Sequence, residues 1–458
     1  MSGLKNYYLR LSGRQIFARL TSGRRRRTAL ACGGGLAGLL SLQPRVAMGQ
    51  MALQNAIGLE AAGDARVKQQ ELQVYTYKYG DFKMLVTPSL QASYNDNINL
   101  TSSGVQDDFI FSPLVNLTAT YPLTAYNVLN LNIGLGYNEY LNHSSLNSWV
   151  LQSGSGLSFD ILVKNFTINL HDTAAYVQNG GEAGTVNNSL NPLVANTSVF
   201  GTVQNTAGVL VRWNMGVIVL SLGYDHEIAL STDSAFQSQN QSTEEVVSRL
   251  GYNFSPALTV GIEASGSFMS YEQTTLNNNN DYTIGMYGDW QPSDHLHIRP
   301  RVGYSISDFQ QTSTTPLPGQ VVPPETGNVG SYYIDLSVTH QIAKAMNYSL
   351  SVGHETQAGI QSDEVEDWYF RPSINWKIIK DLGLSTSLSY ENGTQGVGNI
   401  QGNLTEKYVF YGLNVGLNYP IIRRLTAGLS YQLTVRSSND NQNYTQDIVT
   451  LSLSYPFK

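Results

Sequence analysis

Hydrophobic and small polar side chains alternate at every second position over most of this chain, from about Phe82 to the last residue. The segment 129–137 is representative, with leucine, isoleucine or tyrosine at each odd position and asparagine or glycine between them. A side-chain period of two indicates β-strands, because successive side chains point to opposite faces of a sheet. One face is apolar and the other polar in strand after strand. The pattern therefore predicts an all-β, antiparallel up-and-down barrel that spans a membrane, with lipid outside and water inside.

The composition agrees with a barrel wall rather than a bundle of membrane helices. Charged residues make up 13% of the 458 residues, and 28 residues are tyrosine. Soluble domains carry about 25% charged residues. No apolar run reaches the roughly 18 residues that a membrane-spanning helix requires. A closed barrel is then the remaining way to satisfy every backbone hydrogen bond inside a bilayer.

The first 49 residues predict a cleaved export signal. They hold nine basic residues and no acidic one, with a basic stretch that ends at Arg27 and a weakly apolar run after it. Ala47 and Gly49 supply small residues at the −3 and −1 positions, which predicts cleavage before Gln50. We favour the general secretory route, because a barrel crosses the inner membrane unfolded. A twin-arginine signal at Arg26-Arg27 is the alternative.

Removal of that signal leaves an acidic chain with 18 basic and 34 acidic residues. A protein this acidic is repelled by phosphates, so no nucleic-acid partner is expected. The single cysteine, Cys32, lies within the predicted signal. A mature chain without cysteine has no disulfide framework and no thiolate metal site. We expect no cofactor.

The connections between the predicted strands alternate in length. Short ones such as Ser255-Pro256 and Lys380-Asp381 carry turn residues, whereas long ones such as 178–197 and 310–330 are rich in small and polar residues. Outer-membrane barrels have short periplasmic turns and longer external loops. We count about eighteen strands, in a range of about sixteen to eighteen, and barrels of this size typically leave an aqueous channel. We assign 1–49 to the signal peptide, 50–81 to a short periplasmic N-terminal extension, and 82–458 to the barrel of a Gram-negative outer membrane.

The apolar residues of each strand predict which side faces lipid. In the strands at 218–224, 296–304 and 425–433, the outward sets include Leu222, Val302 and Leu429. Aromatic residues gather near the strand ends, where amphipathic rings form the interfacial girdles of membrane barrels. The girdle candidates are Tyr137, Trp149, Trp213, Tyr224, Tyr252, Trp290, Tyr304, Trp368, Trp376, Tyr390, Tyr419 and Tyr431. The alternative is the ordinary enrichment of aromatic residues in strands.

Two segments resemble known sequences. Gly80-Asp81-Phe82, Tyr94–Ile98 and Asp107–Phe111 together resemble the opening of the outer-membrane family labelled "putative β-barrel porin 2". The resemblance implies an outer-membrane barrel, sometimes associated with polysaccharide export or secretion loci, and supplies no catalytic residues. The rest of the chain matches only in pattern.

The last strand resembles the recognition signal for barrel assembly, which alternates apolar residues and closes on an aromatic one. The matching residues are Val449, Leu451, Leu453, Tyr455 and Phe457. Lys458 departs from the pattern, because the aromatic residue is usually last. The expected partners are therefore the barrel-assembly machinery and periplasmic chaperones, together with outer-membrane lipid and lipopolysaccharide. A polysaccharide is a further candidate partner, because amide side chains in the loops could bind sugars.

Charged residues at lumen-facing positions are the candidates for solute selectivity. The basic candidates are His295, His297, Arg299, Arg301, Arg371 and Lys377, and the acidic candidates are Asp225, Glu227, Glu263 and Asp289. A ladder of positive groups in a pore attracts anions, and opposed acidic groups would create a transverse field. The alternative is that these groups only solvate the lumen and pair with one another.

Catalytic chemistry is not predicted. His295 and His297 lie two apart on one strand, but no third ligand lies near them in sequence, so no metal site is expected. The trio His143, Ser144 and Ser145 has no evident carboxylate to orient the histidine. The sequence thus predicts a porin-like channel for passive diffusion of small hydrophilic solutes. An exopolysaccharide export channel, or a structural or adhesive surface barrel plugged by its own loops, are the alternatives.

Overall fold

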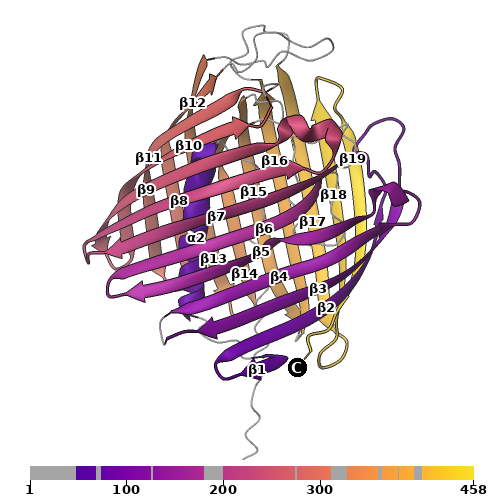
Figure 1. Cartoon of the computed structure of the whole chain (residues 1–458), viewed down its shortest axis with the longest axis horizontal. Coiled ribbons are helices and arrows are strands. Elements are labelled where there is room, and N and C mark those ends of the chain that lie inside the picture. The colour runs from indigo at the N-terminus through magenta and orange to yellow at the C-terminus, as the bar shows by residue number, and fades with distance from the viewer. Residues whose placement is uncertain are drawn as a thin grey trace, which may run out of the picture.

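The computed structural model describes residues 48–68, 74–124, 127–179, 200–273, 276–310, 327–358, 364–379, 381–396 and 405–457. These residues form an antiparallel sheet in which eighteen long strands, β2 to β19, close into a barrel (Figure 1). The predicted fold class and strand number are confirmed. Residues 1–47 of the predicted signal (1–49) and the long connections 180–199 and 311–326 lie outside the described residues, and residues 48 and 49 begin the helix Met48–Lys68.

The barrel strands follow one another in chain order. Their bounds are β2 Phe82–Asn95, β3 Asp108–Pro122, β4 Val128–Tyr140, β5 Ser148–Val163, β6 Phe166–Asn179, β7 Phe200–Asn214, β8 Ile218–Ser231, β9 Gln241–Ser255, β10 Leu258–Tyr271, β11 Asn278–Ser293, β12 Leu296–Gln310, β13 Gly327–Ala343, β14 Met346–Ala358, β15 Glu364–Ile379, β16 Leu382–Gln395, β17 Glu406–Pro420, β18 Thr426–Ser438 and β19 Tyr444–Ser454. A short strand, β1 (Tyr77–Tyr79), pairs with the start of β2. Two 3₁₀ helices, η1 (Ser144–Leu146) and η2 (Ser234–Gln239), lie in connections.

The first and last long strands close the barrel. β19 pairs with β2 in antiparallel register from Ile448 opposite Asn95 to Ser454 opposite Ser89. The chain beyond β19 continues the contact, because the Tyr455 N–H donates to the Pro88 carbonyl at 3.0 Å. No unpaired sheet edge is left at the seam, which is the condition for backbone groups in hydrocarbon.

The ends of the barrel differ in their connections. β5 and β6 are joined by Lys164-Asn165, with Lys164 at a φ of +55°, and β7 and β8 by a turn that contains Gly216 at a φ of +89°. Such left-handed residues allow tight hairpins. These short turns lie at the same end as β1 and the C-terminus (Figure 1). We call this end the turn end and the opposite one the loop end.

The outer surface is apolar, as the alternation predicted. Leu222, Val302 and Leu429 are each close to half exposed on it, and Trp149 is 74% exposed. Aromatic residues pair near both ends. Tyr137 contacts Trp149 at 5.4 Å between ring centroids at the loop end, and Phe166 stacks on Trp213 at 5.0 Å at the turn end. An apolar belt bordered by aromatic rings is the outer surface that a bilayer requires.

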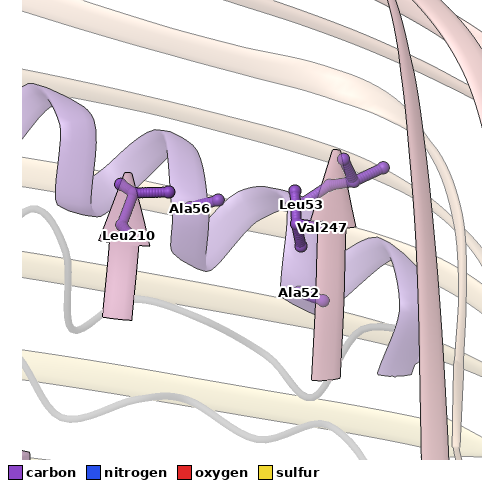
Figure 2. Packing of buried hydrophobic residues seen from close by; sticks show 5 residues of the cluster. All are labelled: Ala52, Leu53, Ala56, Leu210 and Val247. Atoms are coloured by element: carbon purple, nitrogen blue, oxygen red, sulfur yellow. The ribbon is translucent and has the colours of Figure 1, made fainter. Parts of the chain in front are cut away.

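A helix lies inside the barrel, whereas the sequence around 57–62 predicted only a turn or two of helix in a periplasmic extension. α2 (Met48–Lys68) runs along the lumen, and its residues Ala52, Leu53 and Ala56 are buried against Leu210 of β7 and Val247 of β9 (Figures 1 and 2). Residues 50–68 therefore do not form a periplasmic extension, although β1 does lie at the turn end. The burial of this helix was hard to predict because alanine supplies two of the three helix residues in the buried cluster. None of the described helices is long and apolar enough to cross a membrane.

Candidate functional site: the barrel lumen

The inner wall carries a buried network of charges centred on Glu263 of β10. The Arg301 Nε of β12 donates to Glu263 Oε1 at 2.9 Å, and Arg249 Nε of β9 lies 3.5 Å from Glu263 Oε2. The Tyr333 hydroxyl of β13 donates to the same carboxylate at 2.8 Å. Glu263 is 1% exposed and Arg301 6% exposed. Since buried ions persist only when paired, these groups hold one another in place.

A second network surrounds Arg371 of β15. Its Nη2 lies 3.0 Å from Glu355 Oε1 on β14 and 2.9 Å from Glu391 Oε1 on β16. Asp367, on the same inner face of β15, accepts a hydrogen bond of 2.6 Å from the Gln357 amide. Three neighbouring strands are thus joined by charge-assisted hydrogen bonds across their inner faces.

Four arginines of the inner wall each lie over a tyrosine ring. The pairs, with guanidinium-to-centroid distances, are Arg249 over Tyr287 at 4.1 Å, Arg301 over Tyr333 at 5.5 Å, Arg371 over Tyr369 at 4.2 Å and Arg436 over Tyr408 at 5.1 Å. The arginines come from every third strand, β9, β12, β15 and β18. A ring under a guanidinium replaces lost hydration by cation–π attraction, which suits partly desolvated cations.

Glycines make room for these tyrosine rings. A Cβ on Gly303 would lie 2.4 Å from the Tyr333 ring and 2.4 Å from the Ile284 carbonyl oxygen, and a Cβ on Gly261 would lie 2.6 Å from the Tyr287 ring. The absent side chain lets the ring lie flat against the backbone of the neighbouring strands. The lumen glycines therefore position the arginine–tyrosine pairs.

The structure places only part of the predicted basic ladder on one strand. His297, Arg299 and Arg301 share the inner face of β12, whereas His295 lies in the exposed turn before that strand. The His295 carbonyl still accepts a hydrogen bond of 2.8 Å from the Gln341 N–H of β13. His297 Nε2 contacts Asp289 Oδ1, and Arg299 Nε lies 3.5 Å from Asp289 Oδ2. Lys377 is exposed near the turn end of β15.

The acidic candidates do not face the basic ladder from across the pore. Asp289 lies on β11, directly beside β12, and Glu263 lies on β10, one strand further along the wall; both contact basic residues of β12. Asp225 of β8 is paired with His171 Nε2 at 2.8 Å, and Glu227 follows it on the same inner face. The alternative stated from the sequence, that these charges pair with one another, describes this geometry. A selectivity role for them stays a prediction.

Seven residues that take part in the charged contacts of the lumen were not identified from the sequence. The missed partners are His171, Glu245, Arg249, Glu355, Glu391, Glu406 and Arg436. Each of them occupies an inward position of its strand, so the alternation alone could have identified them as lumen residues. Their pairing could not have been predicted from the sequence pattern, because the partners lie on different strands. Glu355 and Glu391, for example, contact Arg371 from the strands on either side of it.

The helix α2 contacts the lumen wall on two sides. Glu60 Oε2 accepts a hydrogen bond of 2.8 Å from Arg249 Nη1 on β9. On β14, the side-chain amide of Gln50 donates a hydrogen bond of 3.1 Å to the Thr356 hydroxyl. The side-chain amide nitrogen of Gln54 lies 3.5 Å from Glu355 Oε2. Between these polar ends, Leu53 is fully buried in the small apolar cluster (Figure 2). The helix therefore joins the β9 and β14 regions of the wall.

Possible catalytic and metal chemistry was tested against the same geometry. His143 Nδ1 lies 2.8 Å from Asp108 Oδ2, so a carboxylate does orient this histidine, contrary to the expectation. Asp108 also accepts the backbone N–H groups of Asn142 and His143, which makes it an anchor for the loop. Among the hydrogen bonds of the described residues, none joins Ser144 or Ser145 to the His143 ring. The described part of the chain holds no group of three or more His, Cys, Asp or Glu residues suited to a metal ion.

No family model matches this chain, and no curated protein matches it. It is similar in structure to OccK5 (OpdH) of Pseudomonas aeruginosa, with 11% identity, a TM-score of 0.45, and coverage of 82% of this chain and 98% of that one. It is also similar to OccAB3 of Acinetobacter baumannii, with 10% identity, a TM-score of 0.44, and coverage of 82% and 99%. The closed barrel is established by this chain's own strand pairing.

Proposed function

We propose that this chain is an outer-membrane channel for passive diffusion of small hydrophilic solutes. The observation that carries the proposal is a closed barrel of eighteen strands whose outer face is apolar and whose inner face is polar. Barrels of this size enclose enough space for an aqueous path. The aromatic pairs near both ends fit two membrane interfaces, and the short turns at one end fit the periplasmic side.

The charges of the lumen support passage rather than chemistry. The buried arginines are matched by carboxylates and stacked on tyrosines, so their geometry is fixed before any solute arrives. Arg299 and Lys377 are more exposed than Arg301 and lie toward the turn end. A solute moving through the lumen would contact these two groups and the neutral polar wall. We propose no enzymatic activity.

The finer assignments follow from the sequence. The likeness of the first two strands to the porin family named above, and a signal peptide cleaved before Gln50, are parts of this proposal. Assembly through the terminal strand, with Tyr455 and Phe457 beside β2, is a further part. No feature of the described residues favours polysaccharide export.

Reconstitution tests the proposal. Purified, folded protein in a planar bilayer is expected to give stepwise ion conductance, and vesicles that contain it are expected to swell in small sugars but not in large ones. A heat-unfolded sample serves as the control for leakage. A barrel that inserts, shows the gel mobility of the folded form and conducts nothing in any variant would contradict the channel.

A further inference from the structure

The lumen helix α2 is not used by the proposed function, and it lies where a solute would have to pass. It contacts strands β7, β9, β10, β11 and β14. In the sheet β9 and β14 are separated by four strands, so the helix reaches between two distinct parts of the wall. Among the helix residues whose side chains are described, 50 and 52–62, none is exposed. The helix is therefore enclosed by the barrel at this level.

From these contacts we propose that α2 is a displaceable plug that keeps the channel closed, and that the Glu60–Arg249 ion pair is its latch. The inference rests on the proposed function and adds a regulated state to it. The plug closes the path by filling the lumen between β9 and β14. Opening consists of its withdrawal from the wall.

The contacts of the helix are of a kind that can be made and broken. Its apolar contact is small, since the buried cluster consists of Ala52, Leu53 and Ala56 with Leu210 and Val247, and only Leu59 packs against it as a partly buried residue. Its polar contacts in the described residues are single hydrogen bonds and one ion pair. By contrast, each pair of neighbouring barrel strands is joined along most of its length. The helix can thus leave without unfolding the barrel, because its contacts are few and local.

The latch is built so that its release leaves no unpaired charge buried. Arg249 keeps Glu263 at 3.5 Å and its stacking on the Tyr287 ring when Glu60 departs. Glu60 gains water in exchange for the arginine. An ion pair with a second partner ready costs less to break than an isolated one, because the remaining charge is not orphaned.

The direction of withdrawal follows from the chain. Gln50 lies near the loop end, beside Thr356 in the last residues of β14, and the helix leads toward β1 at the turn end (Figure 1). With the predicted cleavage before Gln50, the plug begins at a free end. A free end can be drawn out through the turn end without threading a loop through the lumen.

A reversible tether tests the plug. The mature chain is predicted to lack cysteine, so Ala56→Cys with Leu210→Cys would join the helix to β7 through the only disulfide present (Figure 2). The control pair is Ser349→Cys with Ser373→Cys, whose hydroxyls lie 2.7 Å apart on β14 and β15 and leave the helix free. Both are reconstituted in planar bilayers, and gels without reductant confirm the crosslinks.

We expect the oxidised helix tether to lower the open fraction of the channel at least about tenfold relative to its reduced form, while the control pair conducts equally in both states. Deletion of 50–68, and Glu60→Gln, are expected to raise the open fraction. Equal conductance of the oxidised and reduced tether, in a protein that conducts, overturns the plug and leaves the channel standing. Silence of wild type, reduced tether and a folded deletion variant together overturns the channel itself.

Discussion

The two parts of the lumen wall are built from different side chains. From β2 to β4 the inner positions hold mostly asparagine, serine, threonine and glycine, which bond mainly in separate pairs. In β5 and β6 a chain of hydrogen bonds from Asp160 through Asn169 and His171 reaches Asp225 of β8 and leads into the charged region. Ser112 donates to the Asn138 side chain at 2.7 Å, and Thr118 to the Asn132 side chain at 3.1 Å. From β8 to β18 the inner positions hold arginines, carboxylates and tyrosines that are linked across several strands. The helix α2 contacts mainly this second region.

The comparison shows two ways to make a wet inner surface. Neutral side chains can each be satisfied by one neighbour or by water, so the loss of one affects little else. The charged region fixes its groups collectively, since Arg249 and Arg301 share the single carboxylate of Glu263. We therefore expect the charged region to respond to substitution mainly through stability, and the exposed groups to respond through selectivity.

The largest expected effect is at the shared carboxylate. Glu263→Gln removes the carboxylate that Arg301 contacts at 2.9 Å and leaves Arg249 with Glu60, and breaking a buried pair such as Arg301–Glu263 costs about 3–5 kcal/mol. Unfolding in urea from lipid vesicles, followed by gel mobility and tryptophan fluorescence, measures the loss.

The matched change in the neutral region is Thr118→Ala, which removes one hydrogen bond to Asn132. Its expected cost is about 0.5–1 kcal/mol, because the freed amide remains accessible to water. Equal costs for the two substitutions would break the distinction between the regions.

A smaller effect is expected where a tyrosine ring covers glycine. Gly303→Ala places a Cβ 2.4 Å from the Ile284 carbonyl oxygen and the Tyr333 ring, and overpacking of this kind costs about 1–3 kcal/mol. The same unfolding assay detects it.

The control glycine has open space. A Cβ on Gly383 of β16 would find nothing closer than 3.8 Å, at the Asn418 carbonyl oxygen. Gly383→Ala is expected to change stability by no more than about 0.5 kcal/mol. If Gly383→Ala proves as costly as Gly303→Ala, the ring contact is not what the glycine serves.

The outer face was predictable from the sequence, and the inner face only in part. Lipid and water demand opposite side chains at alternate positions, so the period of two identified Val302 as outward and Arg301 as inward. Pairing was not predictable, because Arg301 meets Glu263 from a strand two places away through the register of β10, β11 and β12. An alternating pattern predicts which face of its strand a residue occupies. It does not predict which residues of a non-adjacent strand lie at the same level along the barrel.

The length of the helix α2 and its place in the lumen were missed for a different reason. Residues 50–62 carry few strongly apolar side chains, and alanine and glycine give little periodic signal. Their burial depends on a wall that offers Leu210 and Val247 at inward positions of β7 and β9. These two apolar residues, which interrupt otherwise polar inner faces, were the available signal that something packs inside the barrel.

The smallest expected effect concerns ion selectivity, and it distinguishes an exposed arginine from a buried, ion-paired one. The Arg299 side chain is 30% exposed beside Asp289, whereas that of Arg301 is 5% exposed against Glu263. Arg299→Ala is expected to lower the anion-to-cation permeability ratio by about twofold, since an exposed charge in a pore is partly screened by salt. Reversal potentials across a salt gradient measure the ratio. Arg301→Ala should change it less while destabilising the barrel more, because its charge is already matched. If Arg301→Ala shifts the reversal potential more than Arg299→Ala, the buried network lies in the ion path. The distinction between buried, paired charges and exposed charges would then be wrong.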